Sequence, residues 1–245
     1  MFELRSSRFA EGDTFEVAGV PVRLKVDRRS RRVSLRLDPA RREVIATAPS
    51  ARRLKEAVAF AGQRAQWIGE AVSKLPVPQP LAPGGTIEVL GEPCRLVGAP
   101  GRRGQGLVRE GGLRLVAHGE DEAFVRSAVR VLRGEALKVL SARTALHAAA
   151  LDRPLPKVAL TDARSRWGSC TPARGLQAAS VRYSWRLVLA PFEVMDYVAV
   201  HECAHLVHAD HSDRFWAVVK TLAPDVKGPR AWLRAHGARL HAFGR

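Results

Sequence analysis

A segment rich in proline and glycine, at residues 76–85, most limits how this chain can fold. Six of its ten positions are Pro76, Pro78, Pro80, Pro83, Gly84 and Gly85. Proline lacks an N–H group and glycine weakens both helices and strands, so such a segment ends regular structure. We therefore expect two folded regions in the 245-residue chain, at 1–75 and 87–245, joined by a linker at 76–86.

The first region has the pattern of β-strands followed by a helix. Between residues 15 and 48, apolar side chains alternate with polar or small ones, which is typical of half-buried strands. The tripeptide Asp38-Pro39-Ala40 interrupts this pattern and suggests a hairpin. Between residues 50 and 75, apolar residues recur at steps of three and four, as on one face of a helix. We expect a basic, β-rich subdomain with a helix.

The second region mixes strands and helices. Residues 86–118 have the pattern of short strands interrupted by a Gly/Arg loop, and residues 121–150 have a sustained helical pattern. Residues 155–190 again favour extended structure, before Pro191 opens a helix that we expect to end near residue 208. These patterns predict an α+β fold, and no internal repeat is apparent.

Composition places the chain among globular proteins, with 46% hydrophobic and 26% charged residues. No apolar run reaches the roughly 20 residues that span a bilayer. The opening residues Met1 to Arg5 lack the apolar core of a secretory signal. The three cysteines lie far apart and provide no disulfide framework. We expect a cytoplasmic protein with no membrane partner.

The chain is strongly basic, with a net charge of +16, and 33 of its 40 basic residues are arginine. The charge is spread out, because residues 1–75 hold 16 basic and 9 acidic side chains and residues 120–245 hold 19 and 12. The densest cluster consists of Arg28, Arg29, Arg31 and Arg32. It either binds a polyanion such as nucleic acid or forms the solvated end of a hairpin, and the even spread of charge favours the second.

Four of the eight histidines lie between residues 201 and 211. Residues four apart share one face of a helix, so His201 and His205 can direct their imidazoles at one ion. Neutral imidazole is a good zinc ligand. Glu202, beside the first histidine, can hold a zinc-bound water and accept its proton. This is the H-E-x-x-H arrangement of zinc peptidases.

The third ligand is either His208 or His211. On a straight helix His208 lies about 10.5 Å along the axis from His201, which is too far to share an ion easily. His211 follows a point where the helix can end, and its spacing matches the third ligand of metzincins. Metzincins have glycine where this chain has His208, so that class is not assigned. We favour His211 as the third metal ligand. We expect His208 to contact one of the metal-binding side chains, to face the substrate, or to lie at the surface.

Four motifs, in this order, resemble the YgjP-like (DUF45) metallopeptidases, which are similar to the SprT-type and WLM zinc peptidases. They are RWGSC from Arg166, WRLVLAP from Trp185, HECAH from His201, and DHS followed by FW from Asp210. The resemblance is strong over about residues 160–220 and extends to the N-terminal basic strands and the helix near Trp67. It implies a minimal zincin domain, with helices packed on a small antiparallel sheet and a catalytic core at about 120–235.

The resemblance implies one zinc ion, whose ligands are His201, His205 and His211. It also implies Glu202 as the general base. Two positions depart from the family pattern, because Cys203 follows the glutamate in place of leucine and Asp210 precedes the third histidine in place of asparagine. Neither change removes a ligand. We expect Cys203 to be a small buried residue, and Asp210 to orient a ligand imidazole or to cap the turn.

Other residues near these motifs could serve a reaction. Tyr183, Arg186 or Tyr197 could stabilise the oxyanion of a tetrahedral intermediate, although a structural role is the more common one for each residue type. The strand near residues 178–184 could offer an edge to an extended peptide. Cys170 is a poorer zinc ligand, because three histidines already suffice and leave a position for water.

The sequence therefore predicts a zinc metallopeptidase that hydrolyses peptide bonds of a protein or peptide, with water activated by zinc and Glu202. The alternative is a nucleic-acid-associated zinc protease that acts on DNA-bound proteins, which the net charge of +16 and the likeness to SprT-type peptidases suggest. A third reading is a non-enzymatic zinc-binding module. The intact Glu202 argues against it, as does a set of three ligands, because structural zinc sites usually have four.

Overall fold

The structure is a computed structural model, and it describes residues 9–38, 41–75, 81–101, 103–163 and 166–244. The chain divides into two compact units, one ending at residue 78 and the other beginning at residue 79. Each unit has its own hydrophobic core. The proline-rich part of the expected linker, at 76–80, lies outside the described residues.

The first unit is built on a four-stranded sheet in the order β1-β2-β4-β3. Its strands are β1 (Thr14–Val17), β2 (Val20–Val26), β3 (Ser34–Asp38) and β4 (Glu43–Ala48). The outer pairs are antiparallel and the central pair, β2 with β4, is parallel. The antiparallel pairing of β3 with β4 confirms the hairpin expected near Asp38, although residues 39–40 lie outside the described part.

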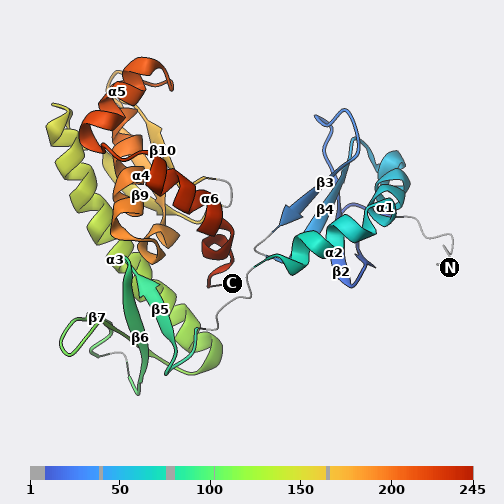
Figure 1. The fold of residues 1–245 in the computed structure, drawn as a ribbon, viewed down its shortest axis with the longest axis horizontal. Coiled ribbons are helices and arrows are strands. Elements are labelled where there is room, and N and C mark those ends of the chain that lie inside the picture. The colour runs from blue at the N-terminus through green and yellow to red at the C-terminus, as the bar shows by residue number, and fades with distance from the viewer. Residues whose placement is uncertain (1–8, 39–40, 76–80, 102, 164–165, 245) are drawn as a thin grey trace. The chain divides into compact units, whose positions relative to one another are not determined.

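Two helices pack on this sheet, α1 (Leu54–Gln63) and α2 (Ala65–Ser73), after a 3-10 turn at Ala51–Arg53 (Figure 1). The sequence predicted helical structure between residues 50 and 75, and the structure interrupts it at Arg64, whose φ of −107° departs from helical values. Apolar faces of the helices and strands together form the core of the unit. Its fully buried members include Val22, Leu24, Val44, Leu54 and Ile68.

The second unit begins with a sheet of the same topology, in the order β5-β6-β8-β7. Its strands are β5 (Thr86–Val89), β6 (Glu92–Ala99), β7 (Gly106–Val108) and β8 (Arg114–His118). Here too the outer pairs are antiparallel and the central pair is parallel, and a helix follows the last strand. The chain therefore contains a repeated arrangement of four strands and a helix, so the expectation that it has no internal repeat is wrong.

The repeat is also present in the sequence once the strands are aligned. Residues 14–24 read TFEVAGVPVRL and residues 86–96 read TIEVLGEPCRL, with seven of the eleven positions identical. The turns agree as well, because Ala18 and Gly19 have φ of 53° and 73°, and Leu90 and Gly91 have 54° and 83°. Two successive residues with positive φ form the tight turn that joins antiparallel strands.

Helix α3 (Asp121–Ala150) is the longest described helix of the second unit. It runs from the β5–β8 sheet at one end to the remaining helices at the other (Figure 1), and it matches the helix expected at 121–150. Asp121 and Glu122 lie in its first turn, where negative charge offsets the positive end of the helix dipole. Its buried face is mostly apolar, with Phe124, Ala128, Leu132, Ala136 and Leu140, and it also contains the polar Ser127, Thr144 and His147.

A three-stranded sheet lies beside α3, in the order β10-β11-β9. Its strands are β9 (Lys157–Thr161), β10 (Gly168–Thr171) and β11 (Ser180–Ser184). Strands β10 and β11 are antiparallel but β11 and β9 are parallel, so this sheet is mixed rather than wholly antiparallel. The strand expected to offer an edge to a peptide, β11, is the central one, and its neighbour β10 lies at an edge.

The last helices are α4 (Phe192–Ala204), α5 (Asp213–Leu222) and α6 (Lys227–Ala242), and a 3-10 helix at Trp185–Leu189 precedes them. Helix α4 packs against α3, α5, α6 and β10, so it lies in the middle of the unit. The combination of helices with small mixed sheets confirms the α+β class. Among the described residues, no helix has both the length and the apolar character needed to cross a membrane.

Candidate metal centre

The candidate centre stands on helix α4, which is surrounded by other elements. Nine of its thirteen residues are buried, among them Val194, Val198 and Val200. Pro191 stands at its N-cap, where the missing N–H costs no hydrogen bond. Because packing on all sides leaves such a helix little freedom, the side chains that project from its last turn are held in defined positions.

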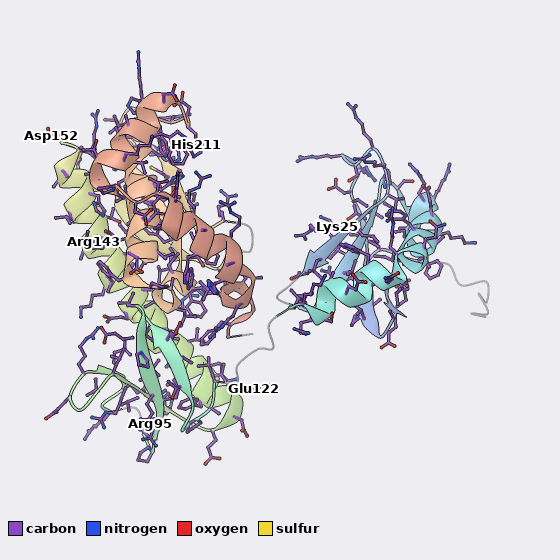
Figure 2. All side chains as sticks on the ribbon, viewed as in Figure 1. Lys25, Arg95, Glu122, Arg143, Asp152 and His211 are labelled. Carbon is purple, nitrogen blue, oxygen red and sulfur yellow. The ribbon has the colours of Figure 1, made fainter. Side chains whose placement is uncertain are left out.

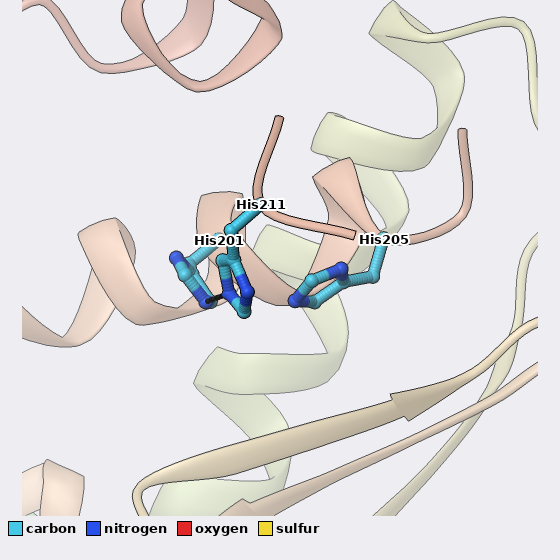
Figure 3. A group of neighbouring side chains, drawn as sticks. All are labelled: His201, His205 and His211. Atoms are coloured by element: carbon cyan, nitrogen blue, oxygen red, sulfur yellow. Dashed lines mark hydrogen bonds between the residues drawn. The ribbon is translucent and has the colours of Figure 1, made fainter. Parts of the chain in front are cut away.

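His201, His205 and His211 come together at the C-terminal end of α4 (Figure 3). One ring nitrogen from each lies within 4.8 Å of those of the other two. The Nε2 atoms of His201 and His211 are 3.2 Å apart, and the ring centroids of His205 and His211 are 4.8 Å apart. His201 and His205 are half-buried and His211 is exposed, so the group opens to solvent on the side of His211.

His201 and His205 are held in their neutral form. Burial, with a smaller contribution from the neighbouring His205 and His211, lowers the pKa of His201 to about 4. Burial also lowers the pKa of His205. A neutral imidazole offers a lone pair, and a metal ion binds that lone pair rather than the protonated ring.

The group fits a metal ion better than it fits a self-contained hydrogen-bonded cluster. The Nε2 atoms of His201 and His211 stand 3.2 Å apart, where one hydrogen bond can join only two of the three rings. A cation among the rings would accept a lone pair from each of them. Three histidines with an open side are also a donor set found in catalytic zinc sites.

His208 contributes through its backbone rather than its ring. The Nδ1 of His205 lies 3.0 Å from the carbonyl oxygen of His208, and since a carbonyl only accepts, Nδ1 carries the proton and donates it. This leaves the lone pair on Nε2, facing the other histidines. Helix α4 ends at Ala204, short of the expected end near residue 208, and the turn that follows brings this carbonyl back toward His205.

Glu202 lies beside the histidines and is almost fully buried, at 5% exposure. Burial raises the pKa of its carboxyl to about 7, and the positive charge of Arg166 works against this rise. Gly168, on β10, contacts the carboxylate so closely that a Cβ there would stand 2.5 Å from Oε1 of Glu202. A side chain at residue 168 would therefore displace the carboxylate, a constraint that the sequence pattern did not reveal.

Aromatic rings of α5 support the histidines. The ring of Phe215, which is fully buried, lies 5.0 Å from His201, 4.5 Å from His205 and 4.8 Å from His211. Trp216 lies next to it, at 5.9 Å from His201 and 6.0 Å from His211. Phe215 therefore packs against the whole triad, and α5 keeps the three rings together.

A polar network anchors α4 to α3 on the other side. Arg143 donates two hydrogen bonds to the carboxylate of Asp196, at 2.6 and 2.8 Å, and His147 lies 2.7 Å from the same carboxylate. Arg143 projects from α3 in Figure 2. At the next residue of α3, the Thr144 hydroxyl pairs with the Tyr183 hydroxyl at 2.9 Å. These contacts tie α3 to α4 and to β11.

Three residues that we considered for supporting roles are engaged elsewhere. Tyr183 is fully buried with its hydroxyl on Thr144, and Arg186 is buried against Asp162 and the carbonyl of Phe243. Asp210 accepts hydrogen bonds from the backbone and hydroxyl of Ser212, so it caps the turn before α5.

Of the tyrosines and arginine considered as oxyanion stabilisers, Tyr197 lies beside the histidines. Its ring is 6.2 Å from that of His201, one turn before it on α4, and only 6% of the residue is exposed. Burial raises the pKa of its hydroxyl, so this group remains a proton donor at neutral pH.

The cysteines behave as buried thiols. Cys203 is fully buried on α4, and burial raises its pKa to about 12, as it does for Cys170. A thiol that resists ionisation is a poor metal ligand and a poor nucleophile. Within the described ranges, the group of side chains suited to metal binding consists of the three histidines.

The basic cluster of the first unit lies in the connection between β2 and β3. Its members Arg28, Arg29, Arg31 and Arg32 are exposed. Because β2 and β3 are not neighbours in the sheet, this segment is a crossover and not the expected end of a hairpin. Beside it lies an open groove of about 380 Å³, lined in part by Arg32, Phe60, Arg64 and Trp67.

Comparison with protein-family models identifies the family of this chain. The family model for the YgjP-like metallopeptidase domain matches residues 31–236, which include all four motifs, the three histidines and Glu202. Searches of curated proteins and of solved structures found no significant match. Since the family match covers most of the 245 residues, the chain belongs to the family of YgjP-like metallopeptidase domains.

Proposed function

We propose that the protein is a zinc-dependent peptidase whose metal is held by His201, His205 and His211 and whose general base is Glu202. The observation that supports this most is the convergence of three imidazoles beside a buried carboxylate. We place the catalytic centre in the region from residue 87 to residue 245, with the core at about 120–235.

The three histidines would bind the ion through their free ring nitrogens. When bound, zinc acts as a Lewis acid that polarises the scissile carbonyl and lowers the pKa of the attacking water. Glu202 orients that water, takes its proton as the water attacks, and delivers the proton to the leaving amine. Its pKa of about 7 suits both roles, because a carboxyl near neutrality can accept and then release a proton.

The substitution Glu202→Gln tests this proposal. It keeps the shape of the side chain and removes the base, so we expect zinc-loaded protein to retain one ion per chain and to lose at least about 10²-fold in peptide hydrolysis. Hydrolysis is followed with unfolded casein and a fluorogenic peptide library. Glu193→Gln, at an exposed position of the same helix, is the control and should hydrolyse like the parent. Full activity of Glu202→Gln would refute the role of Glu202.

A second candidate function is association with nucleic acid through the first unit. The groove beside the basic cluster combines Arg32 and Arg64 with Phe60 and the 44%-exposed Trp67. Cations beside exposed aromatic rings are typical of surfaces that bind single strands, where bases stack on the rings. A protein so equipped would hydrolyse partners bound to nucleic acid.

The affinity of the intact protein for a labelled single-stranded DNA, measured at several salt concentrations, tests this second candidate. We expect affinity to fall steeply as salt rises, because bound arginines displace counterions from phosphates. Trp67→Ala should weaken binding by about 1–3 kcal/mol, the typical contribution of one stacked base. No measurable binding at low salt would refute it.

We propose that the protein works in the cytoplasm, a reducing compartment, because its cysteines form no disulfide. Cys94, Cys170 and Cys203 are all free, and two of them are fully buried. Free buried thiols are typical of proteins that work where disulfides do not form.

A further inference from the structure

A charged groove lies beside the candidate metal centre. It is open, has a volume of about 490 Å³, and is lined by Trp167, Arg230, Leu233 and Arg234. Trp167 directly precedes Gly168, the residue that contacts the Glu202 carboxylate. One lining residue of the groove is therefore the sequence neighbour of the residue that contacts the proposed general base.

Arg230, in the wall formed by α6, is connected to the histidines through Trp216. The guanidinium of Arg230, on α6, lies 5.2 Å from the ring centroid of Trp216. That ring is in turn 5.9 Å from the ring of His201. One lining residue of the groove, Arg230, is thus linked to His201 through the ring of Trp216.

Two guanidinium groups line this groove. Arg230 and Arg234 are four residues apart on α6 and share one face of the helix. Both are exposed, and neither forms an ion pair with a carboxylate in the part of the chain that the structure describes. The cations are therefore available to a ligand.

The walls of the groove are held in place. The ring of Trp167 stacks on that of His241, with centroids 4.2 Å apart, and it packs against Gly237 so closely that a Cβ there would meet the ring at 3.0 Å. Both partners belong to α6, so Trp167 and the helix form one rigid surface. Leu233 adds an apolar strip between the two arginines.

We propose that this groove is a specificity site, which binds an oxyanion group of the peptide substrate next to the scissile bond. A guanidinium presents a planar pair of N–H donors that matches the oxygens of a carboxylate or a phosphate. The methylene groups of the bound residue would rest on Trp167 and Leu233, while the anion meets Arg230 and Arg234. The inference rests on the proposed peptidase function and names the substrate class of that site.

The sources of such an anion are a glutamate or aspartate side chain, a phosphorylated serine, and the terminal carboxylate of a peptide. Four peptides of otherwise identical sequence distinguish them. The first three have blocked ends and carry glutamate, phosphoserine or glutamine at one position. The fourth carries glutamine and has a free C-terminus.

Binding is measured by calorimetry with the zinc-loaded full chain carrying Glu202→Gln, so that no hydrolysis is needed and a failure of the proposed function does not hide the result. We expect at least one anionic peptide to bind about tenfold tighter than the blocked glutamine peptide, since two exposed guanidinium contacts each contribute a few-fold. The anion that gains most identifies the source.

Arg230→Gln and Arg234→Gln, added singly and together to the Glu202→Gln protein, should remove this preference. The second variant is needed because Arg230 also stacks on Trp216. Arg133→Gln, an exposed arginine on α3, is the matched control and should keep the preference. In active protein, the ratio of kcat/KM for anionic and neutral peptides should fall mainly through KM. Equal affinity for all four peptides, or a preference that survives in the double variant, would overturn the proposal.

Discussion

Gly168 contributes to the site through the side chain that it lacks. The missing Cβ leaves room for the carboxylate of Glu202, which would otherwise meet it at 2.5 Å. The φ angle of Gly168 is not in the left-handed region, so its role is to provide space and not to allow an unusual conformation. The placement of the proposed base is therefore determined by two residues, one on α4 and one on the edge strand β10.

Gly168→Ala should lower activity strongly. The added methyl group forces Glu202 out of position, and a displaced base of this kind costs about 10²-fold in kcat. Gly134→Ala is the matched control, because nothing lies within 4 Å of a Cβ at that exposed helical position. It should keep activity and raise stability by about 0.5–1 kcal/mol. Unchanged activity of Gly168→Ala would contradict this account of the site.

The buried Glu202 should make the metal-free protein less stable at alkaline than at acid pH. Burial raises its folded-state pKa to about 7, so the stability that it contributes is complete below the unfolded-state value of 4.5 and is lost as pH rises through 7. Metal-free Glu202→Gln should then exceed the parent in free energy of unfolding by about 2–3 kcal/mol at pH 8 and match it near pH 4. Urea unfolding at both pH values measures this, and an equal difference at both would contradict it.

Among the elements, α4 depends most on its connection to α3. Asp196 receives Arg143 and His147 from α3, and these side chains are between 6% and 27% exposed. Burial works to raise the pKa of Asp196, but the hydrogen bonds from His147 and Arg143 outweigh it and hold the pKa below the usual value. Its contribution to stability is therefore present above pH 4 and is lost in acid.

Asp196→Asn should lower the free energy of unfolding by about 3 kcal/mol at pH 7, because it leaves the guanidinium of Arg143 partly buried without its counter-charge. Urea unfolding measures the change. Glu193→Gln, at an exposed position in the first turn of the same helix, should change stability by no more than about 0.5 kcal/mol. If the two substitutions had the same effect, the network would not anchor α4.

The elements differed in how far the sequence could predict them. Helix α3 was predicted over its full span, because apolar residues recur on one face from Phe124 to Leu140 and no proline interrupts the pattern before Ala150. The central position of β11 was not, since its pairing with β9 joins residues more than twenty positions apart and leaves no local signal. The repeated four-stranded arrangement was not predicted, although TFEV and TIEV stand in the sequence. Alternation of apolar and polar residues identifies each strand separately and does not reveal that two sets of strands are related.

The same contrast holds for the site. His201 and His205 were predicted because a single helix fixes their spacing, and His211 followed from the need for the chain to turn back. The packing of Phe215 on the histidines agrees with the expectation that the helix after the ligands packs on the active helix. The contact of Gly168 with Glu202 depends on how β10 packs against α4, which no local pattern encodes. Sequence reasoning thus finds groups that lie close along the chain and misses a contact from a distant strand.

At the scale of the whole molecule, the chain has two cores that share no residue. Leu24 and Ile68 belong to the first, and Leu132 and Leu140 belong to the second. The family match from residue 31 to residue 236 extends over both units, so the first unit is part of the family's pattern and not an unrelated addition.

Separate cores predict two unfolding transitions in calorimetry. Leu24→Ala should lower one transition and Leu132→Ala the other, since each substitution opens a cavity that costs about 2–5 kcal/mol in its own core. Both leucines are at most 1% exposed, so they form a matched pair. A single transition that shifts with either substitution would show that the units unfold as one.

The position of the metal tests the central claim most directly. Crystals of the zinc-loaded protein, measured on both sides of the zinc absorption edge, locate the ion by its anomalous scattering. The account predicts one strong peak per chain, at about 2.0–2.1 Å from a ring nitrogen of each of His201, His205 and His211, with Glu202 close by but not a ligand. A peak bound by Cys170 or Cys203, or one that does not involve His211, would contradict it.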